Sequence, residues 1–501
     1  MKRKFRICAA VALSVLVLLV SLPGCALYND KQPPPDTTPA GSDDTSSNTP
    51  MEGYDENGYI LDNIPKDLNF GGADVTFLIW EDCPMLEFYV ESWNGEIIND
   101  AIYERNQIVE SRLDVKLKYV ATQGDSNDMK SYIQKAEADL LSGASEYDIY
   151  AGYSRSAPAM ALSGRCEELT ELDYLDFGMP WWPDSLLEQC MINNRLYFCS
   201  GDLSTNLLWM MIATFFNKEL VEQLELENPY DLVHSNNWTL DKLMELSSNK
   251  YDDKNGNGLV DNLDFFGFII YNINIDAFFT AAGFLAFEKN NDGELILSPS
   301  LTSPKIHDLL SKLGDFLATD DVSFQNSTNI RKIFFEQRAV FTMDRVFIVC
   351  GKDYGSSDNI EFEYGLVPNP KYDQFQENYI TNVGHPFTMY AISVGAFDAD
   401  ACAAVLECLC SESYRRVTPS VYEIAMKVKY ASDDVTAEMY DILRSTVSFD
   451  LARFYDGQAA SIYQAMRTEV INNTRTFASR FKGLSKTMEN GIKTIMDAYT
   501  K

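Results

Sequence analysis

Two rounds of alternating strand and helix patterns constrain the fold more than any other feature of the sequence. In the first round, residues 75–80 are apolar on both faces, which is typical of a central strand in a parallel sheet. Helical spacing follows over 97–113, then a strand with one polar face at 115–119, a helix at 129–141 and a strand at 147–151. This order predicts an α/β domain with a parallel sheet.

A second round begins past Leu196. It contains strand patterns at 210–216 and 266–270 and helix patterns at 240–246 and 306–317. After Ala391 the chain is mostly helical in pattern. We therefore predict an α/β fold made of two such units, with ligands bound in a cleft at the carboxyl ends of the strands.

The first 25 residues carry an export signal. Basic residues at positions 2, 3, 4 and 6 precede an almost unbroken apolar stretch over 7–22, a pattern typical of signal peptides. Leu22-Pro23-Gly24-Cys25 follows and resembles the lipobox of bacterial lipoproteins. We predict that residues 1–24 are a signal peptide and that Cys25 becomes the lipidated first residue. A retained membrane anchor is the alternative.

The next segment has the composition of a flexible tether. Residues 25–70 are rich in Pro, Asp, Ser, Thr, Gly and Asn and hold little that can be buried. About 45 such residues have a random-coil reach of roughly 35–40 Å, enough to hold a domain just off a membrane. No later run reaches the ~18 apolar residues of a membrane span. We therefore expect a domain on the extracellular face of the cell membrane, attached only through lipidated Cys25.

The net charge of the chain narrows the range of possible partners. The 501 residues include 41 Lys and Arg against 74 Asp and Glu, a formal net charge of −33. This surface repels a phosphate backbone, which argues against nucleic acid as a partner.

Cys190 and Cys199 flank a predicted hairpin, in which they would face each other. The sequence allows either a disulfide between these two cysteines or two separate buried thiols.

One motif carries explicit metal chemistry. Residues 253–264 match the calcium loop of an EF-hand, with glycine at the sixth position. Alternate residues of such a loop can converge on one ion, and the predicted ligands of a structural Ca²⁺ are Asp253, Asn255, Asn257, Leu259 through its carbonyl, Asp261 and Asp264. Asp264 stands where glutamate is usual and has a shorter reach. The alternative is a solvated turn of Asn and Gly.

The sequence holds no recognisable catalytic motif. Its three histidines, His234, His307 and His385, lie in different elements, and no nucleophile-elbow, zinc-protease or phosphate-loop pattern occurs. With 74 acidic residues, a glycosidase pair cannot be chosen from the sequence. We expect a protein that is not an enzyme.

Short motifs along the whole chain point to a known family. The more specific ones are 216–220 (FNKEL) and 238–241 (WTLD), and others lie at 94–106, 147–149, 228–230, 266–268 with the calcium-like loop, and 364–372. In this order they resemble the extracellular solute-binding lipoproteins of sugar ABC transporters, the family that includes maltose-binding protein. The resemblance spans most of residues 72–500.

The resemblance implies a two-lobed periplasmic-binding-protein fold with a hinge and a helical C-terminal region. We expect lobe 1 to comprise residues 71–190 and 339–385, and lobe 2 residues 191–338 and 386–501. Proteins of this family close on a ligand and deliver it to an ABC permease that is driven by a separate ATPase. We expect a monomer.

The chemistry of sugars selects the candidate site. A pyranose has apolar faces and a rim of hydroxyl groups, so aromatic rings and planar polar side chains hold it. Residues of these types that follow predicted strands, or lie where the chain enters the second lobe, are Trp80, Glu81, Tyr153, Arg155, Asp202, Asn206, Trp209, Asp344 and Arg345. The resemblance places binding residues at the segments of Tyr153 and Asp344. Trp181 and Trp182 are expected to pack in the core.

The sequence therefore predicts a lipid-anchored, calcium-stapled receptor that captures a carbohydrate of oligosaccharide size by hinge closure. Two other functions stay open: a surface-anchored glycoside hydrolase or esterase, and a solute receptor that feeds a sensor kinase. A ligand other than a sugar is also open.

Overall fold

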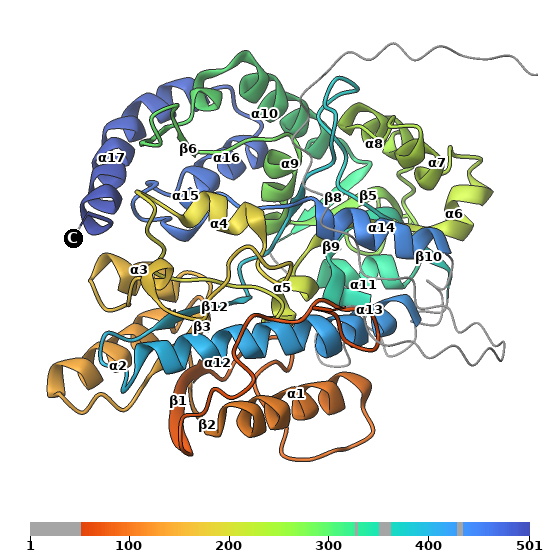
Figure 1. Ribbon diagram of the computed structural model, residues 1–501. Coiled ribbons are helices and arrows are strands. Elements are labelled where there is room, and N and C mark those ends of the chain that lie inside the picture. The colour runs from red at the N-terminus through yellow and green to blue at the C-terminus, as the bar shows by residue number, and fades with distance from the viewer. Residues whose placement is uncertain (1–51, 326–328, 350–361, 428–433, 501) are drawn as a thin grey trace, which may run out of the picture. The chain divides into compact units, whose positions relative to one another are not determined.

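The structure is a computed structural model that describes residues 52–325, 329–349, 362–427 and 434–500 (Figure 1). All of these belong to one compact unit, Asp43–Lys501. The other unit, Met1–Ser42, lies outside the described residues, and so do the predicted signal peptide and Cys25. None of the helices in the described ranges is long and apolar enough to cross a membrane.

Lobe 1 is built on a four-stranded sheet in the order β12-β3-β1-β2. Its strands are β1 (Ala73–Trp80), β2 (Val115–Thr122), β3 (Ile149–Tyr153) and β12 (Thr388–Ile392). β1 runs parallel to β2 and β3, whereas β12 is antiparallel to β3. The central position of β1 confirms the prediction from its two apolar faces. The helices that pack against these strands are α1 (Ile97–Leu113), α2 (Met129–Ser142), α3 (Ser156–Leu162) and α12 (Ala399–Glu412).

Lobe 2 is built on a five-stranded sheet in the order β10-β4-β9-β5-β8. Its strands are β4 (Ile212–Asn217), β5 (Phe266–Tyr271), β8 (Val322–Gln325), β9 (Ala339–Arg345) and β10 (Tyr364–Val367). β5 runs parallel to β8 and β9, and β4 is antiparallel to β9 and β10. The helices that pack against these strands are α6 (Lys218–Gln223), α7 (Pro229–His234), α8 (Leu240–Ser247), α10 (Pro304–Leu317), α11 (Asn329–Phe335) and α14 (Asp434–Ser445).

The remaining elements are short ladders and helices. Two two-stranded ladders join β6 (Phe287–Lys289) with β7 (Leu295–Leu297) and β11 (Thr381–Asn382) with β13 (Val447–Ser448). The remaining α-helices are α4 (Asp184–Cys190), α5 (Thr205–Trp209), α9 (Asp276–Ala281), α13 (Thr418–Lys427), α15 (Leu451–Phe454), α16 (Ile462–Ile471) and α17 (Phe477–Ala498). α16 packs on α10 of lobe 2. The expectation that the chain is mostly helical after Ala391 is confirmed over the described ranges.

Strand pairing corrects the expected division between the lobes. β9 pairs with β4 and β5, so it belongs to lobe 2, although residues 339–385 were expected in lobe 1. β12 pairs with β3, so it belongs to lobe 1, although residues 386–501 were expected in lobe 2. Both strands are buried almost throughout, and a buried apolar strand has the same sequence pattern in either sheet.

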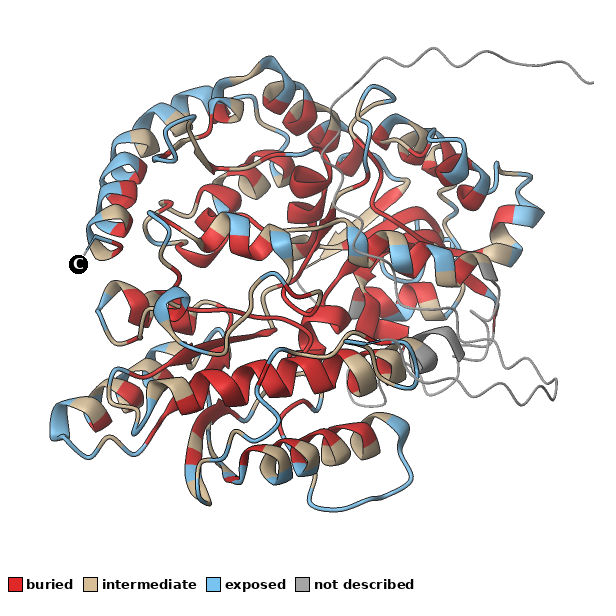
Figure 2. Ribbon diagram, in the orientation of Figure 1, coloured by how far each residue is buried: buried red, intermediate tan, exposed pale blue. Residues whose placement is uncertain are grey.

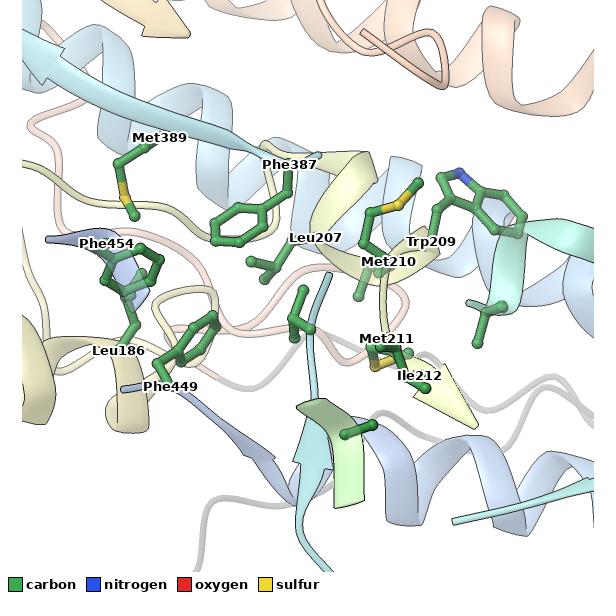
Figure 3. Packing of buried hydrophobic residues seen from close by; sticks show 14 of the residues in the cluster. Leu186, Leu207, Trp209, Met210, Met211, Ile212, Phe387, Met389, Phe449 and Phe454 are labelled. Carbon is green, nitrogen blue, oxygen red and sulfur yellow. The ribbon is translucent and has the colours of Figure 1, made fainter. Parts of the chain in front are cut away.

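Apolar side chains fill the junction where the chain passes between the sheets. Figure 3 shows Leu207, Trp209, Met210 and Met211 leading from α5 into β4, with Phe387 of the β12 segment nearby, and all five are buried. Figure 2 shows that burial is concentrated on the strands and on α12. The crossing segments are therefore part of the hydrophobic core rather than exposed linkers.

The expected tether is shorter than residues 25–70. Tyr59 and Ile64 are buried, and the carboxylate of Asp62 accepts hydrogen bonds from Arg112 Nη1 and Nη2 at 2.8 and 2.6 Å. Arg415 lies 3.4 Å from the same carboxylate. Over its described part, from residue 52 on, the segment is thus packed on the domain. Its polar composition hid this because the contacts that hold it come from one buried carboxylate and two apolar side chains.

The structure settles the cysteine alternative. Cys190 and Cys199 are both free thiols, buried in the core. A tight turn over Asn193 and Asn194, both at positive φ, forms the tip of the hairpin, one residue before the expected tip at Asn194 and Arg195. The hairpin is therefore confirmed, whereas the disulfide is not formed.

Candidate ligand-binding site

A cavity of about 500 Å³ lies where strand ends of the two lobes meet. Tyr153 at the end of β3 lines it from lobe 1, and Tyr271 and Arg345, at the ends of β5 and β9, line it from lobe 2. The crossing segment 384–386 and helices α15 and α16 complete the wall. The volume lies within the roughly 300–1,000 Å³ of small-ligand pockets, and the carboxyl ends of strands are where α/β folds bind ligands.

Four arginines reach the wall from four different segments. Arg155 follows β3, Arg345 ends β9, Arg453 belongs to α15 and Arg467 to α16. Two of them face carboxylates: Arg155 Nη1 lies 3.4 Å from Asp456 Oδ2, and Arg467 Nη1 lies 2.5 Å from Asp276 Oδ2.

The other two arginines have no carboxylate partner within the described ranges. Arg453 donates from Nη1 to the carbonyl of Val383 at 3.2 Å. Arg345 packs on Gly384, where a Cβ atom would lie only 2.6 Å from the arginine Nε. In the described structure, Nε of both arginines is buried without a hydrogen-bond partner. Glycine at 384 is therefore required for the position of the Arg345 guanidinium.

The carboxylate next to Arg345 is used elsewhere. Asp344 is buried and accepts from Arg331 Nε at 2.6 Å and from Asn274 Nδ2 at 3.0 Å. It also accepts from the backbone N–H of Arg345 at 2.8 Å. Asp344 thus fixes the end of β9 and is neutralised by Arg331 behind the cavity wall.

His385 is the one histidine of the wall, and it is held neutral. Burial lowers the pKa of the imidazole well below its usual range, and the charges of Arg453, Arg155, Arg345 and Arg467 lower it further. Ser154 Oγ lies 3.3 Å from Nδ1 and donates to the His385 carbonyl at 2.7 Å. At neutral pH the ring therefore offers one donor and one acceptor without adding charge.

Tyr153 and Tyr271 supply aromatic surface to the cavity. Tyr153 packs edge-on against Trp80 with ring centroids 5.7 Å apart, and Arg155 lies 6.0 Å from its ring centre. Burial raises the pKa of Tyr153 even though Arg155 lowers it, so the phenol stays protonated. Aromatic faces of this kind pack against the apolar faces of sugars.

Among the predicted site residues, Tyr153, Arg155 and Arg345 are brought together in this cavity, and Asp344 lies behind it. The remaining five do not line it. Trp80 and Trp209 are each only 1% exposed, and Trp80 Nε1 donates to Thr388 Oγ1 at 2.8 Å, which ties β1 to β12. Their aromatic character matched a sugar site, but an aromatic residue that faces the core has the same sequence signature.

Two of the three polar residues of this group, Asp202 and Asn206, form hydrogen bonds inside the protein, whereas the third is exposed. Asp202 pairs with Arg444 at 2.8 Å and accepts from Thr418, and the Asn206 amide donates to Glu87 at 2.9 Å. Glu81 is exposed and lies outside the wall. Trp181 and Trp182 are buried, as expected, and both donate to Glu407.

Sequence reasoning missed Tyr271, Asn274, His385, Arg453 and Arg467, which line the cavity. Tyr271 directly follows the strand predicted at 266–270 and could have been selected by the rule that found Tyr153. Arg453 and Arg467 lie on C-terminal helices that no pattern places near the strand ends. No Asp or Glu is among the described residues of the wall, whereas most glycosidases act through a pair of carboxyl groups.

The predicted calcium loop is folded by its own side chains. Asp253 accepts backbone N–H bonds from Gly256 and Gly258 at 2.7 and 2.8 Å, and Gly256 has φ 68°. Asn255 and Asn257 direct their amide nitrogens, not their oxygens, at Asp261. Asp264 Oδ1 is buried without a partner in the described structure. The amide oxygens of Asn255 and Asn257 accept backbone N–H bonds from Asn257 and Leu259, so both amides would have to turn before they could ligate a calcium ion.

Comparison with solved structures identifies the fold. The protein from the ABC transporter of Bifidobacterium longum that binds galacto-N-biose and lacto-N-biose I has a TM-score of 0.54 at 11% identity, covering 86% of this chain and 98% of its own. A sugar transporter from Rhizobium etli has a TM-score of 0.53 at 12% identity, covering 85% and 99%. The cyclic alpha-maltosyl-1,6-maltose binding protein of Arthrobacter globiformis has a TM-score of 0.52 at 14% identity, covering 85% and 99%.

These neighbours define the class of the fold. The alignments cover 85–86% of this chain and 98–99% of the neighbours, so this chain has the two-lobed fold of periplasmic binding proteins, as the resemblance implies. The names of these three solved structures refer to sugar binding or sugar transport. No protein-family model and no curated protein matches the sequence.

Proposed function

We propose that this chain is the substrate-binding component of a sugar ABC transporter, which captures a carbohydrate between its lobes and delivers it to a membrane permease. The observation that carries this is the cavity itself, which both lobes line at their strand ends. The fold supports it, because the three structural neighbours have names that refer to sugar binding or sugar transport.

Ligand capture follows from the division of the wall between the lobes. Tyr153 and Arg155 approach from lobe 1, and Tyr271 and Arg345 from lobe 2. A ligand that contacts both sets binds the closed state more tightly than the open state, and this difference in affinity drives closure. The crossing segments act as the hinge.

Thermal melting of the mature protein against an oligosaccharide library tests this function. A ligand at 100 times its Kd should add about 2.7 kcal/mol to the free energy of unfolding, and small-angle scattering should show a more compact molecule. Absence of a shift with every carbohydrate would refute the proposal. Recovery of a cleaved sugar or ester would instead support the surface hydrolase.

Membrane attachment is a separate part of the proposal. Residues 1–24 direct export, and lipidated Cys25 holds the protein on the extracellular face through a short tether, as a monomer. Cys25→Ala should release the protein from the membrane fraction into the medium. Retention of that variant in the membrane would favour an uncleaved anchor.

A structural Ca²⁺ in the loop 253–264 is the last part. The buried, unpartnered Asp264 Oδ1 and the match of residues 253–264 to the EF-hand pattern support it. Chelator should lower the melting temperature of the wild type but not of Asp253→Ala. Equal melting of the wild type with and without chelator would contradict a bound ion.

A further inference from the structure

The cavity wall differs in charge from the chain around it. The chain holds 74 Asp and Glu against 41 Lys and Arg, so a wall of average composition would carry more acidic than basic side chains. In the described structure the wall instead carries Arg155, Arg345, Arg453 and Arg467 and neither Asp nor Glu. The positive charge is therefore a property of the cavity and not of the protein as a whole.

Internal carboxylates neutralise only part of this charge. Asp456 pairs with Arg155 and Asp276 with Arg467, while Asp344 is taken up by Arg331. Arg345 and Arg453 have no such partner within the described ranges, and their Nε atoms are buried and unsatisfied there.

Arg345 is shielded from water at its Nε, and the nearby charge of Asp344 offsets the cost of this burial only in part. Burial lowers the pKa of Arg345 below its usual range, which reflects this cost. Arg453 is only 9% exposed. An anionic group on the ligand would supply the negative charge that the wall itself lacks.

Hydrogen-bonding capacity leads to the same class of ligand. A guanidinium has five N–H donors and no acceptor, so this wall offers far more donors than acceptors. The hydroxyl groups of a neutral sugar donate as well as accept and would leave donors unmatched. A carboxylate or sulfate only accepts, and its geometry fits the guanidinium fork.

We propose that the ligand of this cavity is an acidic carbohydrate, whose carboxylate or sulfate group binds Arg345 and Arg453 while its ring packs on Tyr153 or Tyr271. This inference rests on the proposed function and names its substrate class. A uronic acid and a sulfate ester offer the same acceptor chemistry, and the test distinguishes them.

The experiment is calorimetric titration of the full mature protein with matched ligands. Neutral oligosaccharides are compared with their uronic-acid counterparts, with the methyl esters of those uronic acids, with sulfated counterparts and with inorganic sulfate alone. We expect at least tenfold tighter binding of the uronic-acid or the sulfated form than of the neutral form. Esterification should abolish the gain of a uronic acid, and added salt should weaken binding of the acidic form.

Two variants test the role of the arginines. Arg345→Gln and Arg453→Gln should each weaken binding of the acidic ligand at least tenfold and bring its affinity toward that of the ester. Arg475→Gln removes an equal charge from an exposed pair with Asp315 and should leave binding unchanged. Without ligand, the melting temperature of Arg345→Gln should equal or exceed that of the wild type, because an unpaired buried charge is removed.

The outcomes separate the two proposals. Tight binding of neutral sugars, with no preference for acidic forms, would overturn this inference and leave the transport function standing. Binding of inorganic sulfate as tight as that of a sulfated sugar would also overturn it. Binding of no carbohydrate at all would refute both. A lower unliganded melting temperature for Arg345→Gln would show that the arginine is a structural residue.

Discussion

Removing the carboxylate of Asp62 tests whether the segment before β1 is part of the folded domain. The Asp62 side chain is 1% exposed and accepts from Arg112, Arg415 and Ser411. Asp62→Asn keeps the shape but leaves two arginines without their counter-charge. Breaking a buried ion pair in this way typically costs 3–5 kcal/mol, so we expect a loss of about 3 kcal/mol in the free energy of unfolding.

The assay is urea denaturation, with Asp74→Asn as the matched control. Asp74 also forms an ion pair, with Lys118, but both side chains are about half exposed, so its loss should cost less than about 1 kcal/mol. Equal, small losses in the two variants would refute the packed segment and restore the long tether.

Acid titration gives an independent check on Asp62. Burial alone would raise the pKa of its carboxyl, but hydrogen bonds and charges from Arg112 and Arg415 outweigh burial and hold the pKa below its usual value. A lowered pKa in the folded state stabilises the protein above the unfolded-state value near 3.8, and this stability is lost as pH falls through the folded-state pKa. Asp62→Asn should therefore remove part of the loss of stability in acid.

Three further predictions concern the core and the cavity. Burial raises the pKa of Glu407 to about 8, so the contribution of Glu407 to the free energy of unfolding should fall as pH rises from about 4.5 to about 8. Glu407→Gln should flatten this pH dependence in urea denaturation, and an unchanged pH dependence would contradict the prediction. Gly384→Ala should displace Arg345 and weaken ligand binding about tenfold in calorimetry, whereas Gly483→Ala, with open space around its Cβ, should not; equal affinities would argue against the placement of Arg345. Cys190 and Cys199 should both be alkylated after unfolding without reductant, and a disulfide-linked peptide in mass spectrometry would count against the free thiols.

The sequence predicted the secondary structure better than its assembly. β1, α1, β2 and α2 begin and end within a few residues of their predicted bounds, because hydrophobic periodicity is a local property. The lobe membership of β9 and β12 could not be predicted, because strand pairing depends on partners that are distant in the sequence. Resemblance to a family gave the two lobes, but not which strands build them.

The candidate site was predictable only where it follows directly from a strand end. Tyr153 and Arg155 lie just beyond β3, and Arg345 ends β9, so a rule based on strand ends finds them. Arg453 and Arg467 reach the same cavity from helices, through packing that periodicity does not encode. Trp80 and Trp209 satisfied the chemical criterion for sugar binding but face the core, because that criterion carries no information on direction.

The arginines also connect ligand charge with closure of the lobes. Burial is the largest cause of the low pKa of His385, and the charges of Arg155 of lobe 1 and of Arg345 and Arg467 of lobe 2 all lower it further. Like charges brought together in a site with little water repel each other, and the ion pairs of Arg155 with Asp456 and of Arg467 with Asp276 reduce this repulsion without removing that of Arg345. An anionic ligand removes this repulsion only when it contacts both lobes. A neutral ligand would leave it in place, and for this reason the charge of the ligand and the closed state are expected to depend on each other.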